Sequence, residues 1–65
     1  MRVTLRRKVR NGSEGPEYVN HDVAWPAGWP LPTANDIVSG GPLAGWVEHV
    51  EYDTDAARVL IVLRP

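Results

Sequence analysis

Residues 46–63 hold the feature that most constrains the fold: two strand-forming runs separated by a short polar segment. The first run, residues 46–52, is rich in Trp, Val and Tyr, and residues 53–57 read Asp-Thr-Asp-Ala-Ala. This arrangement predicts a β-hairpin with a loop of about five residues. The second run is purely Val, Leu and Ile over residues 59–63, so both of its faces should meet apolar neighbours. We therefore expect a central strand of a sheet or of a small closed barrel.

The chain length limits the fold to a single domain, residues 1–65, with a small core. Domains of this size often depend on a disulfide, a metal or a partner. The absence of cysteine excludes disulfides and thiolate metal sites, and it fits a reducing cytoplasm. The longest apolar run is far shorter than the roughly 20 residues that span a bilayer, and the arginine-rich start lacks the apolar part of a signal peptide. We expect a cytoplasmic domain without a membrane partner.

The first half of the chain contains two alternating segments. In residues 2–10, Val3, Leu5 and Val9 share one parity, and the other parity is mostly basic, which predicts a half-buried strand. Arg7 breaks the apolar parity, so it should lie at a barrel rim, pair with a carboxylate or mark a bulge. Residues 11–16 are predicted to form a flexible polar loop, too long for a two-residue hairpin turn. Residues 18–25 form the next predicted strand.

Three prolines in residues 26–32 forbid a helix and a central strand there. We expect an extended connection whose Trp29 and Leu31 fold back over the barrel mouth. Residues 36–39 are predicted to be a short strand that a glycine-rich turn follows. A bulge near Glu48 and His49 would bring apolar residues of both parities inward in the next strand.

Five short strands and no significant helix predict an all-β fold, a single small five-stranded antiparallel barrel. The expected core consists of Val3, Leu5, Val19, Val23, Ile37, Val50, Val59, Ile61 and Leu63. The chain resembles the small SH3-like barrels of SH3, Tudor and KOW modules and of several phage neck proteins. The resemblance covers about half of the chain, and residues 31–38, 45–47, 50–53 and 59–63 carry it. The ligand groove of signalling SH3 domains needs an aromatic-rich first loop. Residues 11–17 contain no aromatic residue, so binding of proline motifs is not carried over.

Residue types that carry catalysis or metal binding occur only in unfavourable patterns. His21 precedes Asp22, and Glu48 precedes His49 with Glu51 nearby, but neighbours in a strand point to opposite faces. The two serines lie beside glycines in ordinary turns, and the glycine pairs lack the spacing of a phosphate loop. We expect no catalytic residue, no metal site, no cofactor and no enzymatic activity.

The basic residues and the aromatic residues are the remaining signals for binding. If the first and last strands are neighbours, five basic side chains form a stripe that suits a nucleic-acid backbone: Arg2, Arg6, Lys8, Arg10 and Arg64. The competing interpretation is a solvated face whose arginines pair with Glu48 and Glu51. Trp29 lies between a glycine and a proline, so it is either a lid on the barrel or an exposed anchor for a protein partner, together with Tyr18 and Leu31.

These observations favour a non-catalytic protein-binding or assembly module whose partner is another protein. Nucleic-acid binding through the basic first strand is the alternative. A third hypothesis is a structural subunit that oligomerises through a sheet edge. Arginine outnumbers lysine, and Ala, Gly, Pro and Val are abundant, which is typical of a GC-rich bacterial or phage genome.

Overall fold

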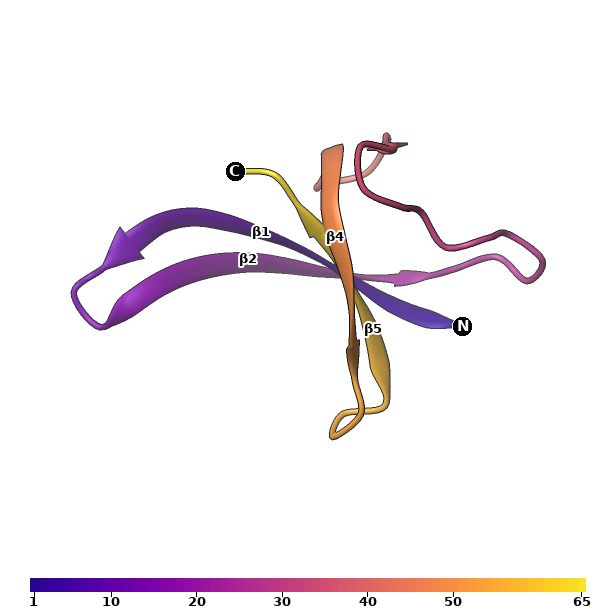
Figure 1. Ribbon diagram of the computed structural model, residues 1–65, viewed down its shortest axis with the longest axis horizontal. Helices are drawn as coiled ribbons and strands as arrows, with labels where there is room; N and C mark the ends of the chain where they lie inside the picture. The colour runs from indigo at the N-terminus through magenta and orange to yellow at the C-terminus, as the bar shows by residue number, and fades with distance from the viewer.

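The computed structural model describes residues 1–65 and contains five strands and no helix. The strands are β1 (Arg2–Gly12), β2 (Gly15–Ala24), β3 (Ile37–Val38), β4 (Gly45–Asp53) and β5 (Arg58–Leu63). The predicted all-β class is confirmed, and the chain has no helix that could cross a lipid bilayer. All five strands belong to one sheet in the order β2-β1-β5-β4-β3. Figure 1 shows the β1–β2 hairpin crossing the β4–β5 hairpin.

Strand β5 lies between β1 and β4, the central position that its apolar sequence predicts. It pairs antiparallel with β4 across the turn at residues 54–57, and it pairs parallel with β1 from Val3 opposite Val59 to Arg7 opposite Leu63. The sheet is therefore mixed, and the prediction of a purely antiparallel sheet is wrong. The edge strands β2 and β3 do not pair with each other, so the sheet is not closed. The segment between them contains three prolines, which cannot donate backbone hydrogen bonds.

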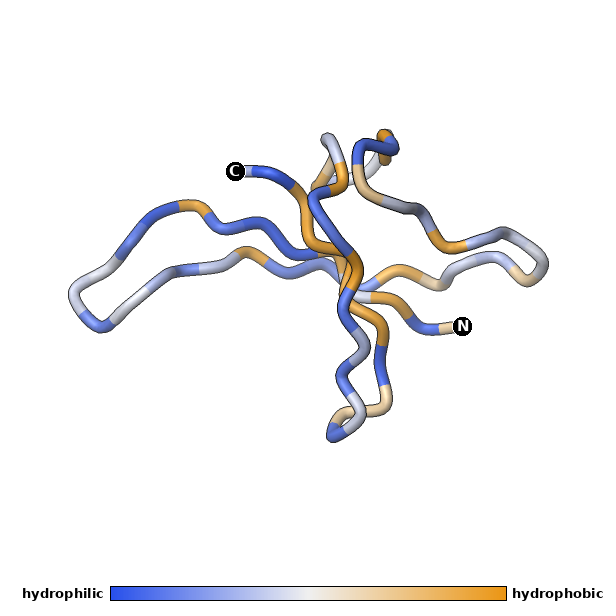
Figure 2. Tube along the Cα trace, viewed as in Figure 1, coloured by the Kyte–Doolittle hydropathy of each residue, from blue (hydrophilic) through white to orange (hydrophobic).

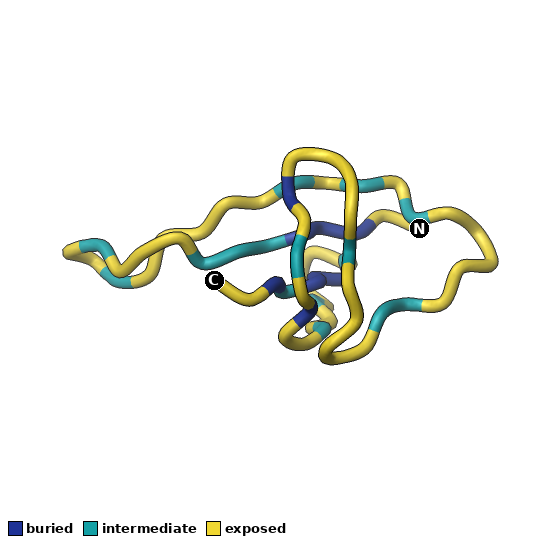
Figure 3. The backbone as a smooth tube through the Cα atoms, turned by 90° about the horizontal axis from the view of Figure 1, so that it is seen from above, coloured by how far each residue is buried: buried dark blue, intermediate teal, exposed yellow.

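The core lies on one side of the sheet, which we call the inner face. Its buried members are Val3, Leu5, Leu43, Val47, Val59, Ile61 and Leu63, and five partly buried residues surround them: Val23, Trp25, Leu31, Val38 and Val50. Figures 2 and 3 show the apolar and buried parts of the chain gathered where the two hairpins cross. Leu60 is also buried, on the opposite or outer face, beside Thr4 of β1. The outer-face neighbours of β5 are polar, since Leu60 pairs with Thr4 and Glu51, so the prediction of apolar neighbours on both faces is wrong for this face.

Two residues expected in the core are exposed. Val19 is 43% exposed, because it pairs with Arg7 at the level where β5 ends and nothing further covers the inner face. Ile37 is 62% exposed, because only one residue of the two-residue strand β3 can face inward and that residue is Val38. Leu43 occupies a core position that the sequence analysis did not assign.

Strands β1 and β2 form one long hairpin with a tight turn. Gly12 pairs with Gly15, so only Ser13 and Glu14 form the turn, and the predicted flexible loop is wrong. Gly15 has a φ of 121°, a conformation that only glycine adopts without strain and that lets the strands continue to the turn. Beyond Arg7 the hairpin has no further strand beside it, and residues 8–18 project as an arm (Figure 1). The arm makes the molecule elongated, 41 × 26 × 19 Å.

Arg7 lies at the end of the sheet, one of the positions that its broken parity predicts. Its Nε donates a hydrogen bond to the carbonyl of Arg64 at 3.1 Å, and its Nη2 donates to the carbonyl of Ala44. Gly45 lies beside the guanidinium, where a Cβ would collide with it. Arg7 therefore fastens β1 to the chain entering β4 and to the chain leaving β5.

Each long strand pair contains one irregularity. In β1 the register shifts between Lys8 and Arg10, and in β4 it shifts between Val47 and His49. The second shift is the bulge predicted near Glu48 and His49. It places Val47 in the core and Val50 against it, although the two residues have opposite parity.

Candidate protein-binding groove

A groove of about 660 Å³ lies where the sheet is open, between the end of β2 and strand β3. Its volume falls within the usual range of ligand sites. The proline-rich segment forms its other wall, and the core residue Leu5 lies at its base. The apolar lining is provided mainly by Val23, Trp25, Trp29, Leu31, Ile37 and Val38.

A four-residue turn sets the position of Trp29. The amide of Trp29 donates to the carbonyl of Pro26 at 3.2 Å, and Gly28 has a φ of 85°, as the third position of a type II turn requires. The turn brings the Trp29 ring edge-on to Trp25, with 5.9 Å between the ring centroids and 87° between the planes. Trp29 is still 63% exposed, so it forms a wall of the groove and not a closed lid.

Both ends of the proline-rich segment are fixed to the sheet. At its start, the amide of Trp25 donates to the carbonyl of Met1 at 2.8 Å. At its end, the amide of Asn35 donates to the carbonyl of Val47, and the amide of Val47 donates to the carbonyl of Asp36, both at 2.8 Å. Backbone hydrogen bonds therefore hold the proline-rich segment in place as a wall of the groove, and the segment does not fill the groove.

Trp25 carries an unmet hydrogen-bond donor. Its indole Nε1 is buried and has no acceptor, although the ring as a whole is only partly buried and lines the groove. A buried donor without a partner costs about 1–3 kcal/mol.

The structure brings two of the three predicted protein-binding residues together. Trp29 and Leu31 both line the groove. Tyr18 does not: it lies in the hairpin arm, 47% exposed, with the guanidinium carbon of Arg6 5.0 Å from its ring centroid. The Tyr18 ring therefore belongs to a second surface, the outer face of β1 and β2.

Most of the predicted basic residues have polar partners. Arg2 donates to Asp22 at 2.6 Å, Arg10 to Glu17 at 2.6 Å, and Arg6 to the side-chain oxygen of Asn20 at 2.9 Å. Arg64 bonds to Asn35 near β3 and so points away from this group. The hydrogen bond from Arg2, with a second from Thr4, holds the pKa of Asp22 below its usual range. The hydrogen bond to Asp22 in turn raises the pKa of Arg2.

The acidic partners come from β2 and not from Glu48 and Glu51, the partners proposed from the sequence. Glu51 instead lies 2.7 Å from the Nε2 of His49, two residues before it on the same face of β4. No three side chains of His, Cys, Asp or Glu come together as a metal site would require. His21 lies opposite Leu5 in the ladder, while Asp22 turns to the other face and bonds Thr4.

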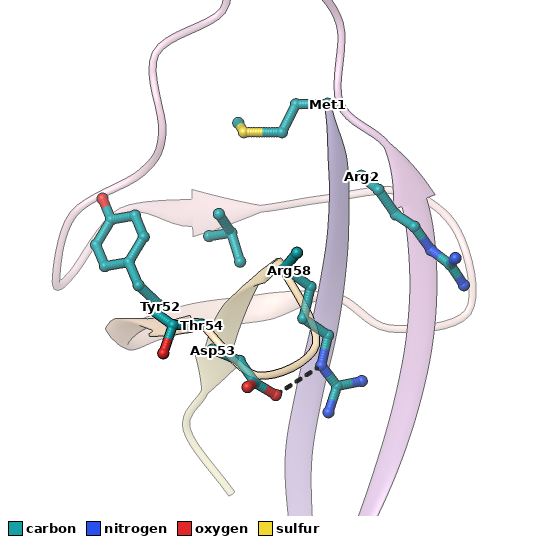
Figure 4. A pocket seen from close by; sticks show the side chains of 8 residues that line it. Met1, Arg2, Tyr52, Asp53, Thr54 and Arg58 are labelled. Atoms are coloured by element: carbon teal, nitrogen blue, oxygen red, sulfur yellow. Dashed lines mark hydrogen bonds and ion pairs between the residues drawn. The ribbon is translucent and has the colours of Figure 1, made fainter.

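A smaller hollow of about 270 Å³ lies near the N-terminus and the β4–β5 turn (Figure 4). Asp53 accepts hydrogen bonds from the amide of Ala56 and from Nε of Arg58, both at 3.2 Å, and these bonds lower its pKa, the Ala56 amide most strongly. Figure 4 shows Asp53 and Arg58 pointing toward each other, with the ring of Tyr52 directed away from this pair. The polar groups of Asp53 and Arg58 thus stabilise the β4–β5 turn through these hydrogen bonds.

The groove lining includes four large apolar residues that were not identified as site residues from the sequence: Val23, Trp25, Ile37 and Val38. Val23 and Ile37 were predicted to lie in the core, and the available signal for all four was their place on either side of the proline cluster. No family model, no curated protein and no solved structure matches the chain.

Proposed function

We propose that this protein is a non-catalytic protein-binding module and that the groove beside Trp29 receives its partner. The observation that carries this proposal is the combination of an apolar groove of about 660 Å³ with Trp29 held at its rim and 63% exposed. A preorganised aromatic side chain supplies a large contact area at little conformational cost, which is typical of interface hot spots.

The lining defines the chemistry of the partner. Eight of the lining residues are hydrophobic and Asp36 is the one charged lining residue, so the partner should insert one or two bulky apolar side chains. The buried Nε1 of Trp25 additionally favours a backbone carbonyl of the partner beside them. A segment of another protein in an extended conformation satisfies both requirements.

We also propose that the fold is an SH3-like barrel that is open on one side. Support comes from the strand order. The first strand, β1, lies beside the last, β5, and strands that follow one another in sequence lie side by side, except that β2 and β3 do not touch. The groove lies at that opening, and a partner seated there would cover it.

Nucleic-acid binding through β1 is the alternative function. Arg2, Arg6 and Lys8 share the outer face, and Lys8 has no carboxylate partner. The ion pairs of Arg2 with Asp22 and of Arg10 with Glu17 place negative charge within the basic stripe, which weakens the attraction to phosphates.

Affinity capture from a native lysate, with and without nuclease, tests the proposal. We expect a protein partner that nuclease does not release and that Trp29→Ala or Leu31→Ala no longer retains. Tyr52→Ala is the matched control, because Tyr52 is an exposed aromatic residue of β4 that does not line the groove. Capture that depends on nucleic acid, or that survives Trp29→Ala unchanged, would contradict the proposal.

A further inference from the structure

Strand β2 leaves one whole edge of the sheet unpaired. It bonds to β1 on one side only, and no other strand lies on its second side. Trp25 and Met1 exchange backbone hydrogen bonds, and such pairs recur at every second residue of an antiparallel ladder. The N–H and C=O groups of His21 and Val19 therefore point toward β1. The residues that alternate with them present these groups to the open edge: Tyr18, Asn20 and Asp22.

We propose that this edge pairs with the same edge of a second copy of the chain, antiparallel and centred on Val19. The two-fold axis passes between the two Val19 residues. Each Tyr18 then exchanges backbone hydrogen bonds with the partner's Asn20, and each Glu17 lies opposite the partner's His21. The two five-stranded sheets become one continuous sheet.

The side chains favour this register over its neighbours. A residue whose N–H and C=O groups point to the open edge must lie opposite another such residue. The two-fold axis must therefore lie at a residue of β2 and not between two successive residues of the strand. Centring on Asn20 sets Val19 against the partner's His21, and centring on His21 sets the two imidazoles against each other. Centring on Val19 brings the two exposed Val19 side chains together and sets Glu17 opposite the partner's His21 twice. Apolar pairs and acid–base pairs of this kind stabilise neighbouring strands.

The composition of β2 supports a second copy as the occupant. Long edge strands usually carry lysines or central prolines that prevent pairing, but the ten residues of β2 contain no lysine, and their one proline lies next to the turn. An isologous contact uses the same edge twice and closes after two copies, so it does not extend into a fibre. The proposed contact is centred away from Trp29 and Leu31, and it goes beyond the proposed function of the groove.

Sedimentation of the intact chain measures this association directly. At concentrations up to about 1 mM we expect a species of twice the 7.2 kDa chain mass. Val19→Lys places like charges opposite each other at the axis and should raise the dissociation constant about tenfold or more. Val9→Lys is the matched control, because Val9 is similarly exposed but lies at the irregularity of β1, away from this edge, and should leave the constant unchanged.

A single cysteine tests the register, because the chain has none of its own. The two Val19 residues would form a non-hydrogen-bonded pair with Cα atoms about 4.5 Å apart, which a disulfide can bridge. Under mild oxidation Val19→Cys should form a covalent dimer, whereas Val9→Cys should not. A chain that stays monomeric up to about 1 mM, a dimer that Val19→Lys does not weaken, or equal cross-linking by both cysteine variants would overturn the proposal. Trp29→Ala should not change the dimer, so the failure of either proposal can be recognised separately.

Discussion

Ile61 and Ile37 received the same prediction from the sequence, but they have opposite environments in the structure. Ile61 is fully buried in β5, between Leu5 of β1 and Val50 of β4. Ile37 is 62% exposed on β3 at the rim of the groove. The same substitution, isoleucine to alanine, should therefore have very different effects on stability.

The magnitude follows from burial. Replacing a fully buried isoleucine by alanine costs about 2–5 kcal/mol, because apolar contact is lost and a cavity remains. A 65-residue domain has a free energy of unfolding of about 3–10 kcal/mol. Ile61→Ala should thus remove a large part of the total, whereas Ile37→Ala should change it by no more than about 0.5 kcal/mol.

Urea denaturation followed by tryptophan fluorescence gives both free energies under the same conditions. We expect a clearly lower midpoint for Ile61→Ala and an almost unchanged midpoint for Ile37→Ala. Equal losses in the two variants would refute the assignment of β5 as the centre of the core and of Ile37 as a surface residue.

Two further predictions concern polar contacts. Arg7→Met removes the hydrogen bonds to the carbonyls of Ala44 and Arg64 and should lower the free energy of unfolding by about 1–3 kcal/mol. Arg6→Met removes one exposed side-chain hydrogen bond and the contact of the guanidinium with the Tyr18 ring, and it should cost less than about 1 kcal/mol. Urea titration measures both costs, and equal costs would contradict the fastening role of Arg7. The folded-state pKa values of Asp22 and Asp53 lie below the ordinary value of 3.8. The stability that these two carboxylates contribute is therefore present above pH 3.8 and is lost as the pH falls through the folded pKa values. Urea midpoints should decline toward pH 2, and Asp22→Asn should reduce the decline.

The sequence was sufficient to predict the β class and the strands, because period-2 alternation and the Val-Leu-Ile run of β5 are local signals. The bulge in β4 was also predictable, because Val47 and Val50 have opposite parity and only a bulge turns both inward. The parallel pairing of β1 with β5 was not predictable, since it depends on how the two hairpins cross and no local pattern encodes it.

The candidate site was only partly predictable for the same reason. The position of Trp29 between a glycine and a proline left two hypotheses, a lid on the barrel or an exposed anchor, and the structure places Trp29 and Leu31 in one groove. Tyr18 was grouped with them because it is aromatic, but the length of β2 separates it from Trp29. The basic stripe was predicted from β1 alone, and the acidic partners on β2 became visible only from the register.

The most direct test of the groove as a binding surface is a nitrogen-15 NMR titration with the captured partner, observed at the three tryptophan indole N–H signals and at the backbone N–H signals. The account predicts large shifts for Trp29, which is exposed at the rim, and for Trp25, whose Nε1 gains an acceptor. Trp46 is also half-exposed but does not line the groove, so its signal should change least. Unchanged Trp25 and Trp29 signals, with shifts confined to Arg6, Lys8 and their neighbours on the outer face, would contradict the account.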